Sequence, residues 1–502
     1  MLRRYSLKNI CARKVSKRIL GLLLLLSAST YGQENRAPNV VLICVDDLLP
    51  ALKCYGNDEV HSPNIDKLAN KAALFTKHYV TVPTCGASRY SLLRSSLPKS
   101  RAELGNEIAN RFSNNNVESP NPPETFIAHL REHGYYTVGI GKISHSSDGY
   151  IYPYNAPARS NRRELPNSWD EILFDAGKWG HGWNAFFGYA NGQSRTSLQG
   201  KVEPFEAGNV DDEGYVDGLT AKLAVKKINE LAHSEQPFLL AVGFFKPHLP
   251  FNSPKKYWDI YDESTLSVTA TPDLPQGVHK ASLHNSSEFN NYQGGAERAS
   301  LESPLSDVYT RQLTHAYYAA VSYVDAQIGK VLTALEDNGL SENTIIVLWS
   351  DHGWHLGDYN MWGKHTLFDK SLRSVLLIKT PQMNTAKRID RVVSSIDIAP
   401  TILELCAVEP LPYADGHSLS ALLADCSISS WDDVAYSYFR NGISMVTPRY
   451  RLTKFFRKEH PIWELYDHKE DPLETKNIAL ERPDVVEELK SKLQEGNTGL
   501  YN

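Results

Sequence analysis

Acidic residues follow two apolar segments at the points where buried strands would end. Asp46 and Asp47 come directly after residues 39–45, and Asp351 comes one serine after residues 344–349. Ligand sites of parallel α/β sheets lie beyond the carboxyl ends of the strands, so we expect these carboxylates at one sheet edge. They would repel one another unless a cation lay between them, and oxygen ligands favour Ca²⁺ or Mg²⁺ over zinc. The alternative is structural, because an acidic pair after a strand commonly caps a helix or closes a turn.

A cysteine lies one helical turn before an arginine in the segment Thr84-Cys85-Gly86-Ala87-Ser88-Arg89. A neighbouring cation lowers the pKa of a thiol, so Cys85 could be a reactive thiolate. The other interpretation is a buried cysteine that acts as a small apolar side chain. The residue types alone leave both interpretations open.

The elements that have to position these residues alternate between strands and helices. Apolar runs predict strands at residues 39–45, 135–140, 237–244, 344–349 and 375–378. Helical spacing predicts helices at residues 62–75, 125–133, 220–232 and 309–337. This alternation predicts an α/β fold with a mostly parallel sheet that is flanked by helices on both faces.

The pattern changes after about residue 430. Short β-rich segments at residues 435–440, 443–446 and 450–456 predict an antiparallel meander, with a last helix at 483–494. We therefore expect a catalytic α/β domain over residues 33–430 and a small C-terminal α+β subdomain over 431–502. Residues 150–215 and 250–305 are rich in Pro, Asn, Ser and Gly, which is typical of substrate-binding loops.

The segment around Cys85 resembles the modification motif of type I sulfatases, Cys-x-Pro/Ala-x-Arg, in which the cysteine is oxidised to formylglycine. Further motifs resemble that family in the same order, at residues 39–48, 62–69, 134–145, 246–248, 350–353, 363–364 and 465–474. The branch around iduronate-2-sulfatase is the most similar, since Lys142 and His145 are three residues apart and histidine follows Asp351. Lys-Pro-His at residues 246–248 belongs to the same branch pattern.

The resemblance implies an alkaline-phosphatase-like fold and a role for each of ten residues. The implied ligands of one Ca²⁺ are Asp46, Asp47, Cys85, Asp351 and His352. The implied catalytic residues are Cys85, Arg89, Lys142, His145, His248 and Lys364. In that family, hydrated formylglycine at position 85 is the nucleophile that attacks the sulfate sulfur, and its second hydroxyl allows the sulfate to leave.

The same resemblance implies what the other side chains do. Arg89 would orient the nucleophile, and Lys142 and Lys364 would neutralise the sulfate oxygens. His145 would act as the base for release of the sulfate, and His248 would bind the sulfate or act as the acid toward the leaving oxygen.

The N-terminus has the layout of a secretory signal peptide. Seven cations precede the apolar residues 19–26, small residues follow at 27–32, and no acidic residue occurs before Gln33. The apolar run is too short for a membrane span, so we expect cleavage after residue 32 and export to the periplasm or the medium. Removal of this segment leaves 46 of the 53 cations against 58 acidic residues, a formal charge of −12. Such a charge argues against nucleic acid as a partner.

These observations predict a sulfatase that acts on sugars of a sulfated oligo- or polysaccharide, with a uronate-containing glycan such as ulvan or glycosaminoglycan as the implied substrate. The implied partner is a formylglycine-generating maturation enzyme. Two alternatives remain: a phosphatase or phosphodiesterase of the alkaline phosphatase superfamily, and a non-catalytic glycan-binding homologue. With six cysteines in the chain, Cys406 and Cys426 could form a disulfide in an oxidising compartment.

Overall fold

The computed structural model describes residues 36–113, 124–155, 160–457 and 460–501. The expected signal peptide over residues 1–32 lies outside the described residues. We describe the unit that begins at Pro38.

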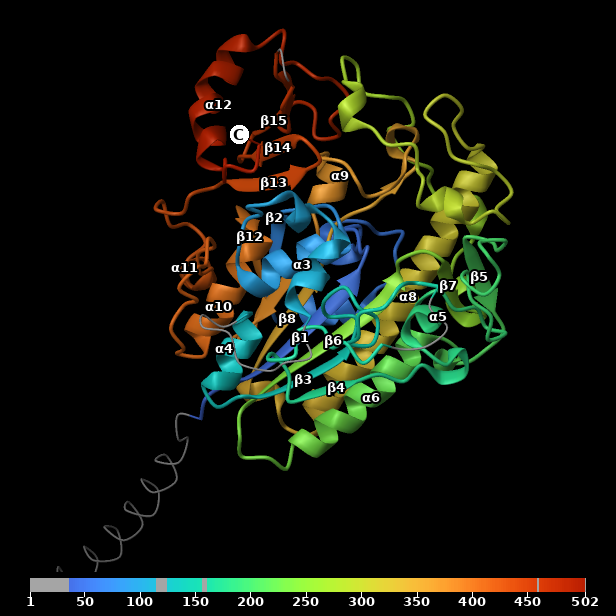
Figure 1. The fold of residues 1–502 in the computed structure, drawn as a ribbon, viewed down its shortest axis with the longest axis vertical. Coiled ribbons are helices and arrows are strands. Elements are labelled where there is room, and N and C mark those ends of the chain that lie inside the picture. Colours follow the sequence, from blue (N-terminus) through green and yellow to red (C-terminus); the bar gives the residue numbers. More distant parts are fainter. Residues whose placement is uncertain (1–35, 114–123, 156–159, 458–459, 502) are drawn as a thin grey trace, which may run out of the picture. The chain divides into compact units, whose positions relative to one another are not determined.

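An eight-stranded sheet runs through this unit in the order β12-β2-β11-β8-β1-β6-β3-β4 (Figure 1). Its strands are β1 (Asn39–Asp46), β2 (Ala73–Tyr79), β3 (Tyr136–Gly141), β4 (Glu171–Leu173), β6 (Phe238–Pro247), β8 (Thr344–Ser350), β11 (Leu376–Lys379) and β12 (Lys387–Ser394). Strand β11 is antiparallel to β8 and β2, and the other neighbours are parallel. The expected mostly parallel sheet is confirmed.

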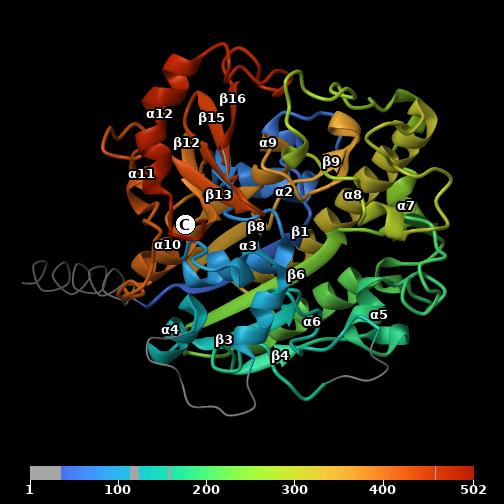
Figure 2. The ribbon, with the colours of Figure 1, turned by 45° about the horizontal axis from the view of Figure 1, so that its top comes forward.

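Helices cover both faces of the sheet (Figures 1 and 2). Val41, Ile43 and Val45 of β1 belong to one apolar cluster with α6 (Val216–Leu231) and α8 (Asp307–Asp337). The alternate residues of β1 point the other way because successive side chains of a strand face opposite sides. On that second face lie α3 (Cys85–Arg94), α4 (Phe126–Glu132) and α10 (Ile398–Leu405), which contact one another. Burial on both faces explains why the central strands are continuous apolar runs.

One expected element is wrong. The helix expected over residues 62–75 is a short helix, α2 (Pro63–Ala69), followed by strand β2. Ala73 and Leu74 pair with Ile378 and Leu377 of β11, so the apolar end of this segment forms a strand of the sheet. A short apolar run fits either a helix or a strand, and only the neighbouring strand decides.

A second sheet lies in the C-terminal part, as expected. It is antiparallel and has four strands, β13 (Ala435–Phe439), β14 (Gly442–Val446), β15 (Tyr450–Phe455) and β16 (Ile462–Asp467), of which the sequence predicted three. Helix α12 (Pro483–Glu495) packs on it through Val485, Val486 and Leu493. Val446 and Phe455 pack instead against Val80 and Val392 near the main sheet. The domain boundary at residue 430 stays a prediction.

Two further expectations concern cysteines and membranes. Cys406 is buried, Cys426 is exposed, and both are free thiols, so the structure does not contain the disulfide between them. The longest helix, α8, carries charged residues along its length, and none of the helices in the described residues has the long apolar stretch of a bilayer span.

A buried histidine in β2 makes the stability of the fold depend on pH. His78 is fully buried between Ser374 and Ser395, whose hydroxyls lie 3.0 Å from its two ring nitrogens. Burial lowers the pKa of His78 to about 3, whereas a histidine in an unfolded chain has a pKa of about 6.5. The unfolded state therefore binds more protons between these values. We expect this residue to lower the free energy of unfolding by up to about 1.4 kcal/mol for each pH unit of acidification.

The measurement is denaturant unfolding of the wild type and His78→Gln between pH 7 and pH 4. The variant should show a shallower pH slope, whatever its absolute stability. His233→Gln changes an exposed histidine and should leave the slope unchanged. An unaltered slope in His78→Gln would contradict the prediction.

Candidate active site

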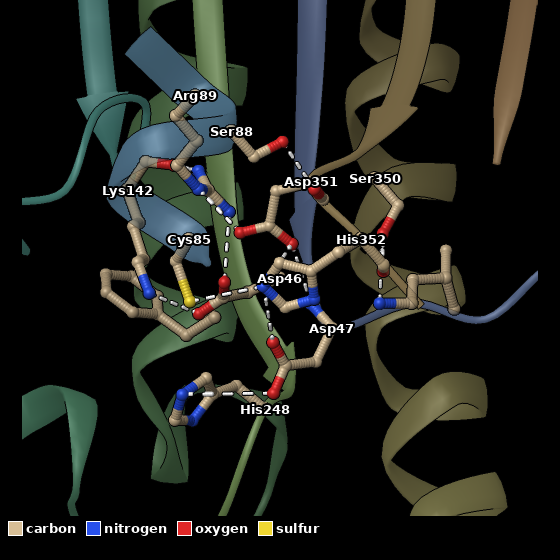
Figure 3. A network of polar contacts seen from close by, with 12 residues as sticks. Asp46, Asp47, Cys85, Ser88, Arg89, Lys142, His248, Ser350, Asp351 and His352 are labelled. Atoms are coloured by element: carbon tan, nitrogen blue, oxygen red, sulfur yellow. Dashed lines mark hydrogen bonds and ion pairs between the residues drawn. The ribbon is translucent and has the colours of Figure 1, made fainter. Parts of the chain in front are cut away.

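The site lies where four neighbouring strands end. Strands β8, β1, β6 and β3 are adjacent and parallel, so their carboxyl ends meet at one edge of the sheet. Asp46 ends β1, Asp351 follows β8, His248 follows β6 and Lys142 follows β3. The topology thus gathers residues that lie about 300 positions apart in the chain, and Figure 3 shows them in one polar network.

Cys85 is the first residue of α3 and points into this network (Figure 3). It is buried, with 4% of its surface exposed, and its Sγ lies 3.3 Å from Nε2 of His352. Burial raises the pKa of the thiol to about 12, against the opposing charges of Lys364 and Lys142. An unmodified Cys85 is therefore a neutral thiol, and the interpretation of this residue as a reactive thiolate is not supported.

Arg89 lies one turn further along α3 and joins the two acidic segments that follow β1 and β8. Its Nε donates to Oδ2 of Asp351 at 2.8 Å, and its Nη2 donates to Oδ1 of Asp46 at 3.2 Å. Its Nη1 donates to the carbonyl oxygen of Lys142. The guanidinium is fully buried, so it holds three strand ends in a fixed arrangement through donors of one rigid group.

This arrangement predicts a large stability effect at Arg89. Arg89→Ala would leave two buried carboxylates without their shared cation, so we expect a loss of about 3–5 kcal/mol in the free energy of unfolding. Arg89→Lys should recover only part of the loss, because an ammonium cannot reproduce the planar fork. Urea unfolding measures both variants. Arg94→Lys, on the same helix but paired with a backbone carbonyl, is the control, and equal stability of Arg89→Lys and wild type would refute the assigned clamp.

Two lysines are paired with the first acidic pair. Nζ of Lys142 donates to Oδ2 of Asp46, and Nζ of Lys364 donates to Oδ1 of Asp47 at 3.0 Å. Burial alone would raise the pKa of Asp46, but the charges of Lys142 and its neighbours hold it well below its usual range. Burial would likewise lower the pKa of Lys364, and Asp47 instead raises it. The ion pair with Asp47 therefore keeps Lys364 charged inside a buried site.

Three histidines complete the set expected from the sequence. Two of them approach Asp47. Nε2 of His352 lies 3.4 Å from Oδ1 of Asp47, and Nε2 of His248 lies 3.9 Å from Oδ2 of Asp47. His145 lies beside these residues and lines a cavity that opens onto Cys85. Its Nε2 lies 3.2 Å from the Tyr154 hydroxyl. Burial holds the pKa of His145 well below its usual range, so its ring is neutral at neutral pH.

The donor set fits a divalent cation. Ligand atoms of Asp46, Asp47, Cys85 and His352 all lie within 4.8 Å of one another. Asp351 adjoins them, because its Oδ1 accepts from the amide of Asp47 at 3.0 Å and lies 3.7 Å from Nε2 of His352. Clustered carboxylates with one imidazole suit a hard ion such as Ca²⁺.

A small cavity of about 220 Å³ opens onto Cys85. The expected residues Lys142, His145, His248 and Lys364 line it. Other lining residues come from the two long irregular segments, namely Tyr154, Trp183, Phe186, Phe187 and Arg195 from 150–215, and Ser287, Glu288 and Asn291 from 250–305. The composition of those segments indicated loops near a substrate but could not identify the residues.

Glu288 is the most prominent residue that the sequence did not reveal. Its Oε1 accepts from Lys364 at 3.2 Å and lies 3.1 Å from Nε2 of His248. Its Oε2 is buried and has no hydrogen-bond partner among the described residues. No motif surrounds Glu288 in the sequence, and only the folded chain brings it beside Lys364.

Comparison with sequence families agrees with this geometry. Residues 38–408, more than half of the chain, match the family model described as Sulfatase. Residues 357–498 match the model described as N-sulphoglucosamine sulphohydrolase, C-terminal.

Individual proteins with a similar sequence or fold extend the comparison. Iduronate 2-sulfatase of Mus musculus is 29% identical over 374 residues, which cover 71% of this chain and 61% of that protein. The present chain thus spans about three fifths of its length. A sulfatase of Formosa agariphila is 27% identical over 472 residues, which cover 93% of this chain and 88% of the relative.

A solved structure, the phosphonate monoester hydrolase of Agrobacterium radiobacter, superposes with a TM-score of 0.71 at 23% identity and covers 92% of this chain and 96% of its own. At that identity the likeness concerns the fold alone, and the expected alkaline-phosphatase-like fold is confirmed. With the family match over residues 38–408 and the arrangement around Cys85, the chain belongs to the sulfatase family.

Proposed function

We propose that this protein hydrolyses sulfate esters of a sugar. The observation that carries the proposal is the place of Cys85, which begins a helix inside a Cys-x-Ala-x-Arg motif and faces carboxylates, lysines and histidines at a sheet edge. Burial keeps the unmodified thiol neutral, which favours conversion of this residue over direct thiolate chemistry. Converted to formylglycine by a maturation enzyme, residue 85 supplies a hydrated aldehyde as the nucleophile.

The cation would be held by Asp46, Asp47, Asp351, His352 and residue 85. Bound there, Ca²⁺ supplies positive charge that lowers the pKa of the nucleophile and stabilises negative charge on the sulfate. Arg89 holds Asp46 and Asp351 in place for this purpose.

Two lysines bind the sulfate group of the substrate, and two histidines transfer protons during its hydrolysis. Lys142 and Lys364 bind the sulfate oxygens as negative charge spreads over them. His145 is neutral, and its Nδ1 has no partner among the described residues, so it can accept a proton. Burial and the charge of Lys364 lower the pKa of His248 to about 3, against the opposing carboxylates of Asp46 and Glu288. Both of its ring nitrogens nevertheless face oxygen atoms, of Leu249 and Glu288. Only the protonated ring satisfies both contacts, and an anionic sulfate favours that form, so we assign His248 as the donor to the leaving oxygen.

The proposed substrate is a uronate-containing oligosaccharide, such as a fragment of glycosaminoglycan or ulvan. A relative named iduronate 2-sulfatase supports the uronate. A second cavity of about 840 Å³ shares His145, Tyr154 and Trp183 with the catalytic one and adds Tyr150 and Tyr152. Aromatic faces of this kind give sugar rings apolar surfaces to pack on. We further propose export through the N-terminal segment.

The test compares hydrolysis of p-nitrophenyl sulfate and p-nitrophenyl phosphate by protein that carries the converted residue 85. A sulfate monoester carries one negative charge and a phosphate monoester carries up to two, and the site already contains several carboxylates. We therefore expect the larger kcat/KM with the sulfate. A larger value with the phosphate would favour a phosphatase or phosphodiesterase, and no turnover of either ester by the converted protein would favour a glycan-binding homologue.

A further inference from the structure

Among the described residues, one cation that lines the catalytic cavity lacks an acidic partner. Lys142 is paired with Asp46, and Lys364 is paired with Asp47 and Glu288. Arg195 lines the same cavity, yet no carboxylate of the described residues lies within the ion-pair distance of 4.0 Å from its guanidinium. Unpaired cations are common on surfaces, but this one faces a site that accepts anionic substrates.

Aromatic rings hold the guanidinium of Arg195 in place. Its central carbon lies 3.7 Å from the centroid of the Phe187 ring and 5.2 Å from that of Tyr292. The Arg195 amide donates to the carbonyl of Phe187 at 3.0 Å, which fixes the loop beneath the side chain. A guanidinium held against rings keeps the N–H groups at its edge available and loses little freedom when an anion binds.

The charge pattern of the cavity separates the roles of its cations. Lys142 and Lys364 adjoin Asp46, Asp47 and Cys85, where the sulfate would react. Arg195 contacts Phe187 and Tyr292 and makes no hydrogen bond or ion pair with those residues, so it faces another part of the substrate. Its planar fork matches a carboxylate with two parallel hydrogen bonds.

We propose that Arg195 is a specificity-determining residue that binds the carboxylate of the uronate sugar from which the sulfate is removed. This inference rests on the proposed function and adds the group on the chain that recognises the uronate. A second sulfate group on the sugar is the competing ligand, and the substrates below distinguish the two.

The experiment compares wild type and Arg195→Gln with three substrates. They are a 2-sulfated uronate disaccharide, its carboxyl-reduced counterpart and p-nitrophenyl sulfate. We expect Arg195→Gln to lose roughly 10- to 100-fold in kcat/KM on the disaccharide, chiefly through KM, since a hydrogen-bonded charge pair is lost. The other two substrates should change by less than about twofold, because neither offers a carboxylate. Arg195→Lys should recover part of the loss, and the exposed Arg298→Gln is the matched control.

Each other pattern overturns the proposal. Equal losses of kcat/KM on all three substrates would mean that Arg195 has a structural role. An equal loss on the two disaccharides alone would mean that Arg195 binds another anion, such as a second sulfate group. No loss on any substrate would mean that Arg195 does not recognise the substrate. Binding of the desulfated uronate disaccharide, measured by calorimetry, separates this proposal from the proposed function. Weaker binding to Arg195→Gln than to wild type supports the inference even if no sulfate is hydrolysed, and equal binding contradicts it.

Discussion

Replacing Cys85 by alanine is expected to lower the rate of p-nitrophenyl sulfate hydrolysis by at least about 10⁴-fold, the scale at which enzymes lose activity with their nucleophile. The side chain is small and its sulfur is the atom that faces His352 and the carboxylates. The change therefore removes the reacting group and leaves little empty space. The thermal unfolding midpoint should change far less than the rate.

The control for this variant is Cys426→Ala, which removes an exposed free thiol far along the chain. It should keep the wild-type rate. The mass of the tryptic peptide His78–Arg89 provides the chemical check, since conversion of Cys85 to the aldehyde makes that peptide lighter by roughly 18 Da. Full activity in Cys85→Ala, or activity in a preparation whose peptide is entirely unconverted, would contradict the role given to residue 85.

The central strands could be predicted because their environment is uniform. Strands β1, β6 and β8 are buried on both faces, so each is a continuous apolar run that the sequence displays directly. The segment at residues 62–75 could not be resolved in the same way. Its last residues are apolar in either conformation, and only pairing of β2 with β11 and β12 makes them a strand.

The residues of the site likewise fall into those that could be predicted from the sequence and those that could not. Residues in motifs, such as Asp46, Cys85 and Lys364, could be named because their neighbours in the sequence are characteristic. Glu288 and Arg195 could not, since each lies in a long segment without periodicity and acquires its role from contacts formed only on folding. Residues that bind the variable part of a substrate lie in such loops, whereas the reacting groups lie at strand and helix ends.

The second large effect concerns the cation. Ion pairs in the site already join the basic side chains to acidic ones before a substrate binds: Arg89, Lys142 and Lys364 contact Asp46, Asp47, Asp351 and Glu288. An anionic sulfate ester would add another negative charge. We expect removal of divalent ions with a chelator to lower the hydrolysis rate by at least about 10²-fold, because the site then lacks the positive charge that would stabilise the nucleophile and the sulfate oxygens. Addition of Ca²⁺ should restore the rate, and restoration by Mg²⁺ alone would overturn the assignment of the ion.

Proton release provides a readout of the cation site that does not depend on turnover. Burial raises the pKa of Asp47 well above its usual range in the cation-free site, despite the opposing charge of Lys364. Cation binding requires the carboxylate, so it should expel a proton, and Ca²⁺ affinity should rise with pH until Asp47 is ionised in the free protein. Calorimetry in buffers of different ionisation enthalpy counts the released protons. Asp47→Asn should abolish the release and weaken binding, whereas the exposed Asp273→Asn should do neither. Unchanged proton release in Asp47→Asn would mean that the ion binds elsewhere, and the charge argument for this site would fail with it.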